Sequence, residues 1–265
     1  MSQSNSKSWL PINDDSPFSL ANIPFGIITS SEQGVKTPAV IVGEHVLVLK
    51  VLADGGAFSE LRESQKFIDT FSQQTLNAFA ALGREAHRAF RSHIQELLKE
   101  DTPYSKQLRD NNDLKSKAIF RSSDVVNHLP LSIGDYTDFY AGQNHAFNVG
   151  VLFRGAANAL QPNYKHLPVG YHGRASSIQV SGTPVRRPNG QILPSPTSKE
   201  PIFSPCKKLD MEVELAAFVC KPNEQGSPVS IDDSEDHIFG YVLMNDWSAR
   251  DIQACKSFSN MVLRD

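Results

Sequence analysis

The hydrophobic and polar positions divide the chain into two parts of different texture. Over residues 23–52, apolar and β-branched residues form strand-like runs separated by Gly43-Glu44, a pattern typical of a hairpin. Over residues 72–100, apolar residues recur every three or four positions, which predicts an amphipathic helix interrupted at Gly83. These apolar positions are Phe79, Leu82, Ala86, Phe90, Ile94 and Leu97. We therefore expect a small β unit with a helix packed on it.

After this helix the pattern changes. The polar run 106–116 favours a loop or a short helix pair that closes the first lobe. Long helical patterns are then absent, and short strand-like segments alternate with glycine and proline. The strand candidates are residues 177–181, 209–219 and 238–245, with Asn189-Gly190 as a two-residue hairpin turn. The pattern predicts a mainly β (α+β) protein with a domain boundary near residue 128.

One predicted strand, LDMEVEL, alternates acids with apolar residues. Side chains alternate between the two faces of a strand, so Asp210, Glu212 and Glu214 share one face. Like charges on one face repel unless solvent screens them or a cation lies against them. The strand continues into Ala-Ala-Phe-Val, which favours burial nearby. Asp210 is interpreted as a flanking residue.

Three further segments are rich in functional groups: residues 133–155, 166–177 and 244–253. Without a matching cysteine pattern, a set of carboxylates would suit a hard cation such as Ca²⁺ or Mg²⁺ better than zinc. The candidate ligands are Asp138, Glu212, Glu214 and Asp246. The alternative for each acid is a solvated surface position or a partnership with an arginine.

The other candidate residues also keep two interpretations. His145 could act as a general base, because imidazole titrates nearest neutral pH, or it could be a hydrogen-bonded structural histidine. Arg154 and Arg250 could clamp carboxylates or form structural salt bridges. Tyr140 and Tyr171, taken alone, fit packing positions as well as ligand contacts.

Composition narrows the class of protein. The 265 residues carry a net charge of −3, with 40% hydrophobic and 21% charged residues, which argues against nucleic-acid and membrane partners. The polar first residues contain no apolar run that would suit a signal peptide. The three cysteines form neither a zinc motif nor a disulfide framework. We therefore expect a cytoplasmic protein.

The segments together resemble the fumarylacetoacetate hydrolase family over about residues 17–254. The segments that carry the resemblance are PFSLANIPFG, IGDYTDFY, HAFNVGVLFRG, LPVGYHGRASSIQVSGTP, LDMEVELAAF and HIFGYVLMNDWSARDIQ. The resemblance implies an SH3-like barrel with packed helices in residues 1–128 and a mixed β-roll in residues 129–254. It further implies a homodimer.

The resemblance also implies an activity. This is the hydrolytic carbon–carbon cleavage of 4-fumarylacetoacetate to fumarate and acetoacetate, in tyrosine and phenylalanine catabolism. Acylpyruvates are alternative diketo-acid substrates within the family, although the N-terminal lobe argues against them.

Matching positions imply roles for the residues singled out above. A Ca²⁺ or Mg²⁺ ion would be held by Asp138, Glu212, Glu214 and Asp246. His145 would be the general base. Substrate contacts would come from Tyr140, Arg154, Tyr171 and Gln253, with Arg250 and Gln253 stabilising the developing oxyanion.

The sequence departs from the family pattern after Ala254. Lys256-Ser257-Phe258 imitates a lysine motif of the family, but the aromatic stretch that should precede it is absent. We interpret residues 255–265 as a divergent tail of a C-terminally truncated chain with an incomplete roll. The glutamate that orients the histidine in the family would then be missing. The alternative function is a catalytically inactive fragment that is unstable or associates with a full-length partner.

Overall fold

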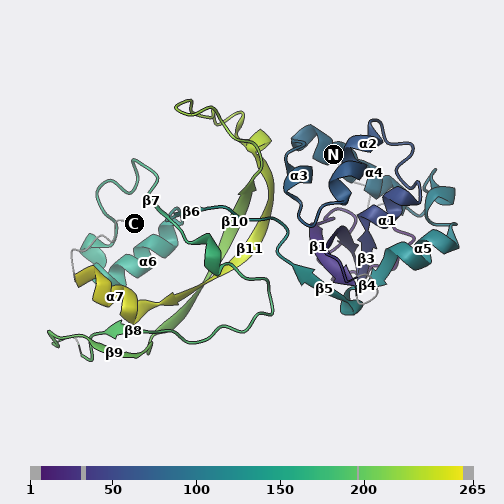
Figure 1. The fold of residues 1–265 in the computed structure, drawn as a ribbon. Helices are drawn as coiled ribbons and strands as arrows, with labels where there is room; N and C mark the ends of the chain where they lie inside the picture. Colours follow the sequence, from purple (N-terminus) through teal and green to yellow (C-terminus); the bar gives the residue numbers. More distant parts are fainter. Residues whose placement is uncertain (1–6, 31–33, 196, 259–265) are drawn as a thin grey trace.

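The computed structural model describes residues 7–30, 34–195 and 197–258 and contains two lobes (Figure 1). Most of the predicted tail, residues 259–265, lies outside the described residues. The first lobe is built on an antiparallel sheet with the strand order β4-β3-β2-β1-β5. Its strands are β1 (Phe25–Ser30), β2 (Thr37–Val42), β3 (His45–Val48), β4 (Ile119–Arg121) and β5 (Val125–His128).

The predicted hairpin joins β2 to β3 through Gly43 and Glu44. Gly43 has a φ of 57°, and a Cβ there would lie 2.8 Å from the carbonyl oxygen of Pro11. The strand-like pattern predicted to run to residue 52 instead ends at Val48, where helix α1 (Leu49–Asp54) begins. That part of the prediction is wrong because nearly every side chain here is buried, which removes the alternation that separates strand from helix.

Helices cover this sheet. They are α2 (Ser64–Phe71), α3 (Asn77–Ala80), α4 (Arg84–Leu98) and α5 (Asn112–Ala118), with 3₁₀ turns η1 (Ser105–Gln107) and η2 (Ser122–Asp124). The spacing predicted the helical segment 72–100, which forms α3 and α4, whereas α2 was not predicted. Gly83, with a φ of 84°, separates α3 from α4, so the predicted interruption is confirmed. No helix in the described part of the chain combines the length and the apolar composition needed to cross a membrane.

The core of the first lobe is aromatic. Phe90 on α4 is 0% exposed, and its ring centre lies 4.9 Å from that of Phe71 and 5.0 Å from that of Phe58. The ring centres of Phe67 and Phe79 lie 5.3 and 5.6 Å from that of Phe90. This lobe therefore has a closed hydrophobic interior of its own.

The second lobe is organised around a long two-stranded antiparallel ribbon, β10 (Leu209–Val219) paired with β11 (Ile238–Ala249). Both strands were predicted, and the second continues four residues beyond its predicted end at Asn245. Shorter strand pairs flank the ribbon: β6 (Thr137–Phe139) with β7 (Gly170–His172), and β8 (Asn189–Ile192) with β9 (Ile202–Pro205). The remaining elements are α6 (Gln143–Arg154), α7 (Arg250–Phe258), η3 (Ala156–Asn158), η4 (Ala175–Ser177) and η5 (Ser234–His237).

Three predictions for this lobe are wrong. Residues 177–181 are not a strand, because turns with backbone bonds from Ile178 to Ala175 and from Thr183 to Val180 occupy the segment. Asn189-Gly190 is not a hairpin turn but the start of β8. The long helix α6 was unexpected.

The packing explains the last two errors. A Cβ at Gly190 would lie 2.7 Å from the Ile252 side chain of α7, so this glycine permits close packing of helix on strand rather than a turn. In α6 the buried positions are small, Ala146 and Gly150, while larger apolar residues such as Leu152 are exposed. The usual helical pattern of large buried residues is therefore absent from its sequence.

The end of the ribbon that contains Phe218 and Phe239 packs against the core of the first lobe (Figure 1). The ring of Phe239 lies 4.9 Å from that of His87 and 6.0 Å from that of Phe79, and Arg84 pairs with Glu235. The coarse α+β class is thus confirmed, with helices and antiparallel strands both prominent.

Candidate metal and catalytic site

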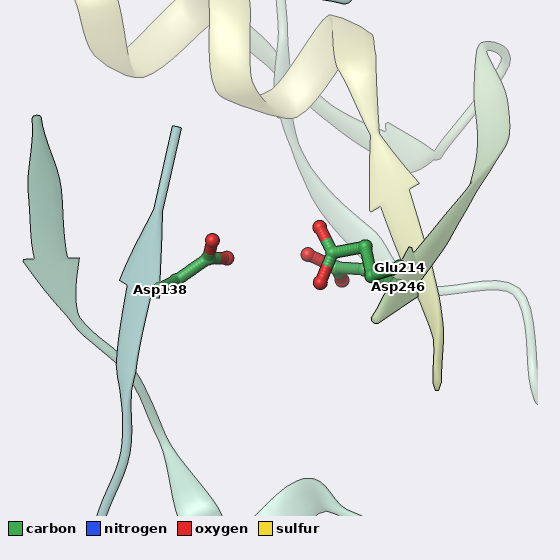
Figure 2. A group of neighbouring side chains, drawn as sticks. All are labelled: Asp138, Glu214 and Asp246. Carbon is green, nitrogen blue, oxygen red and sulfur yellow. The ribbon is translucent and has the colours of Figure 1, made fainter. Parts of the chain in front are cut away.

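Three carboxylates converge between the ribbon and the short β6–β7 pair. Asp138, Glu214 and Asp246 each offer a carboxylate oxygen, and these oxygens lie within 4.8 Å of one another. Figure 2 shows Asp138 on its own strand, facing Glu214 and Asp246 across the space between them. All three residues are half-buried. We call them the carboxylate cluster.

The strand register explains this convergence. Glu212 lies directly opposite Asp246 in the ribbon, and Glu214 lies two residues further along the same face. Residues two apart on paired strands remain within reach of long side chains. Asp138 comes from β6, where it is paired with Tyr171 of β7.

The electrostatics of the cluster favour a bound cation. Burial, together with the charges of Asp138 and Asp246, raises the pKa of Glu214 to about 7. Burial and the charge of Asp138 also raise the pKa of Asp246. These oxygen-only donors fit Ca²⁺ or Mg²⁺, which would offset the repulsion among the carboxylates.

The fourth predicted ligand, Glu212, has other partners. It accepts a hydrogen bond from the Arg250 guanidinium, and its Oε1 lies 3.7 Å from Nε2 of His145. Glu212 is therefore adjacent to the cluster through the ribbon face, but it is not one of the three converging groups. His145, near the start of α6, is placed at the edge of the same acidic face.

Arg250 is held by several acceptors at the start of α7. Its Nε donates to Asp210 at 2.9 Å, and its Nη1 donates to the Gln253 amide oxygen at 3.2 Å. Asp210 was set aside in the sequence as a flanking residue. The available signal was the alternation of LDMEVEL, which already placed Asp210 on the face of Glu212.

Asp251 anchors the first turn of α7. Its carboxylate accepts from the Cys206 thiol at 2.9 Å and from the Lys207 backbone N–H at 2.6 Å. The backbone N–H of Arg250 also donates to the Lys208 carbonyl. These bonds fix the start of the helix that carries Arg250.

Two tyrosines border the site. The Tyr171 hydroxyl donates to Oδ2 of Asp138 at 2.5 Å. The ring of Tyr140 lies 5.6 Å from that of His145, and its hydroxyl lies 3.4 Å from the Ala146 carbonyl oxygen. Burial raises the pKa of Tyr140, although the positive charges of Arg154 and Arg250 oppose this rise.

Arg154 is engaged within its own segment. Its Nε donates to the Asn158 carbonyl at 3.1 Å, and its Nη2 donates to the Ala159 carbonyl at 2.7 Å. These bonds close the turn after α6. Its predicted contact with substrate stays a prediction.

Comparison with known proteins gives two family matches and a consistent set of relatives. The fumarylacetoacetase N-terminal model matches residues 21–130, and the fumarylacetoacetate hydrolase C-terminal model matches residues 136–264. The chain is 64% identical over 249 residues to fumarylacetoacetase fahA of Aspergillus fumigatus, with 93% of this chain and 58% of the relative covered.

Other relatives agree. The chain is 62% identical to the fumarylacetoacetase of Emericella nidulans, with 93% of this chain and 58% of the relative covered. Identity to the human fumarylacetoacetase is 46%, with 93% of this chain and 57% of the relative covered. The chain thus spans somewhat more than half the length of the curated relatives it matches. On these matches, the chain belongs to the fumarylacetoacetate hydrolase family.

Proposed function

We infer that the protein is a hydrolase that cleaves a carbon–carbon bond of 4-fumarylacetoacetate to give fumarate and acetoacetate, in tyrosine and phenylalanine catabolism. The observation that carries this proposal is the carboxylate cluster, whose oxygens lie within 4.8 Å of one another. Next to it on the same ribbon face, Glu212 contacts His145 and Arg250. The names of the relatives support the choice of substrate.

Asp138, Glu214 and Asp246 would hold Ca²⁺ or Mg²⁺, with Glu212 as the proposed fourth ligand on the same face. When bound, the cation supplies Lewis-acid polarisation of the substrate's diketone oxygens. The pKa of Glu214 is raised to about 7 because its carboxylate is partly buried beside the charges of Asp138 and Asp246. A cation bound among the three groups would offset this repulsion and favour the ionised form of Glu214, which supports the assignment.

His145 is the proposed general base. Its imidazole takes a proton from water, and the water oxygen bonds to the substrate carbonyl carbon. The carbon–carbon bond then breaks, and its electron pair leaves with the acetoacetate fragment, which takes up a proton. The Glu212 carboxylate, whose Oε1 lies 3.7 Å from Nε2, would help to orient the imidazole.

The remaining residues bind and orient. Arg250 and Gln253, joined by a 3.2 Å hydrogen bond, would stabilise the oxyanion that develops on the attacked carbonyl. Tyr140, Tyr171 and Arg154 are proposed substrate contacts. A diketo-acid dianion needs such cationic and hydrogen-bonding partners.

The detailed fold of each lobe, the oligomeric state and the cellular location belong to the same proposal. The first lobe's strand order is β4-β3-β2-β1-β5, so β5, the last strand of this lobe along the chain, pairs with β1, the first. This order supports an SH3-like barrel. The second lobe would be a β-roll, and the functional unit a homodimer. A cytoplasmic location is supported by Cys206, Cys220 and Cys255, which are free thiols.

A direct test is turnover by the purified chain. With Ca²⁺ or Mg²⁺ present, the absorbance of the diketone substrate should fall, and His145→Ala should abolish this loss. His166→Ala, which changes an exposed histidine outside the cluster, is the matched control and should retain turnover. Absence of turnover in the wild-type chain would reject the hydrolase proposal for this chain.

A second function is favoured by the exposure of apolar side chains on the ribbon face opposite the acids. Val213, Leu215 and Leu243 are 70%, 71% and 79% exposed there, and Trp247 is 46% exposed. A face of this kind supports the alternative of an inactive fragment that is unstable or associates with a full-length partner. Insolubility, or co-purification with a full-length relative without turnover, would favour this alternative.

A further inference from the structure

Of the three carboxylates in the cluster, Asp138 has the weakest backbone support. Glu214 and Asp246 lie on strands of 11 and 12 residues that pair with each other along nearly their full length. Asp138 lies on β6, a strand of 3 residues whose ladder partner is the equally short β7. Two-stranded ladders of this length are marginally stable on their own. The position of this carboxylate therefore depends on other contacts.

One such contact comes from the strand opposite. Tyr171 is paired with Asp138 in the register, and its hydroxyl donates to Oδ2 at 2.5 Å. Backbone bonds from Tyr140 to Val169 and from Gly173 to Tyr136 close the ladder on either side of this pair. The tyrosine therefore fixes the carboxylate from a segment that is itself tied to β6.

The hydrogen bond leaves the carboxylate able to bind a cation. An ionised carboxylate has two oxygens with about four lone-pair positions, and the tyrosine uses one of them. A hydrogen bond that fixes a carboxylate ligand in this way is the usual arrangement around metal sites in proteins, where it sets the orientation of the ligand.

We propose that Tyr171 is a positioning residue for divalent-cation binding, which holds the Asp138 carboxylate toward Glu214 and Asp246. This inference rests on the proposed function, because it takes the carboxylate cluster to be the cation site. It differs from the substrate contact expected from the family resemblance. A role in substrate binding alone would leave cation affinity unchanged.

The test is cation affinity, measured by titration calorimetry with Ca²⁺ and with Mg²⁺ on the full chain. Tyr171→Phe removes the hydroxyl and keeps the ring. We expect the dissociation constant to rise by about 10-fold or more, the range found when a residue that orients a metal ligand is lost. The melting temperature without metal should stay close to that of the wild type, because the exposed ring is retained.

Tyr241→Phe is the matched control. Tyr241 is 59% exposed and lies on the ribbon face opposite the acids, so removal of its hydroxyl should leave affinity unchanged. Equal cation affinity in Tyr171→Phe and the wild type would overturn the inference, and a raised KM in that variant would then assign Tyr171 to the substrate. A wild-type chain that binds no cation would instead reject the proposed metal site itself.

Discussion

Replacement of Glu214 by glutamine should stabilise the metal-free chain at alkaline pH. The pKa of Glu214 is raised from 4.5 to about 7 by burial and by the charges of Asp138 and Asp246. Between these two values the folded chain binds more protons than the unfolded chain, so the free energy of unfolding falls as pH rises through this window. Above about pH 7 the carboxyl is ionised in both states, and the full loss in the free energy of unfolding is present.

The magnitude follows from the size of the shift. A rise of about 2.5 pKa units corresponds to roughly 3.4 kcal/mol at most. The side chain is partly solvated, which screens the interaction, so we expect Glu214→Gln to gain about 1–2 kcal/mol at about pH 8. At about pH 4, where the wild-type carboxyl is mostly protonated in both states, the gain should largely vanish.

Urea unfolding in the presence of a chelator, followed by circular dichroism at both pH values, measures this difference. Glu224→Gln is the control, because Glu224 is an exposed glutamate in the loop between the ribbon strands and its replacement should leave stability unchanged. A Glu214→Gln variant that is less stable than the wild type at about pH 8, or equally stabilised at both pH values, would refute the reasoning.

Three further predictions concern other parts of the molecule. Asp210→Ala should expose the Arg250 Nε–H, seen by nuclear magnetic resonance as faster hydrogen exchange than in the wild type; unchanged exchange would contradict the 2.9 Å contact. Phe90→Ala should lower the free energy of unfolding by about 3–5 kcal/mol in urea titrations, because the ring is 0% exposed in an aromatic core; a loss below about 1 kcal/mol would contradict this. Leu243→Lys should reduce binding of an apolar dye such as ANS without lowering the melting temperature, because the side chain is 79% exposed; undiminished dye binding would argue that other surfaces bind it.

Local patterns predicted the elements whose burial is one-sided. The predicted bounds of β10, residues 209–219, agree with the structure, and the spacing of Phe79, Ala86 and Phe90 predicted the segment that forms α3 and α4. In α4 the apolar face is buried and the polar face is solvated. In β10 the acidic face is half-buried, and the apolar face with Val213 and Leu215 is exposed. The two faces of each element differ in residue type, so the period appears in the sequence.

The failures occur where both sides of an element are alike or where small residues make the contacts. Helix α6 buries Ala146 and Gly150 and exposes Leu152, which inverts the usual pattern. Gly190 looked like a turn residue because the helix that packs against it lies about sixty positions away in the sequence. Tertiary contacts, which a local pattern does not contain, decided both cases.

The site shows the same division. The candidate acids could be singled out from residue types and from the family resemblance. The sequence did not predict that Glu212 lies apart from the three converging acids. Its partner is Arg250, at the start of helix α7, which donates hydrogen bonds to both Glu212 and Asp210. Asp210 was undervalued for the same reason: its partner lies 40 positions away.

Calorimetric titration of the wild-type chain with Ca²⁺ and with Mg²⁺, at about pH 8, tests the central claim most directly, because every proposed step depends on a cation at the carboxylate cluster. We predict saturable binding at a single site, weaker at about pH 6 where Glu214 is mostly protonated, and lost in Asp246→Asn. Saturating cation should also raise the free energy of unfolding, by about 2.7 kcal/mol at 100 times the dissociation constant. Absence of binding, or binding that Asp246→Asn leaves intact, would contradict the account.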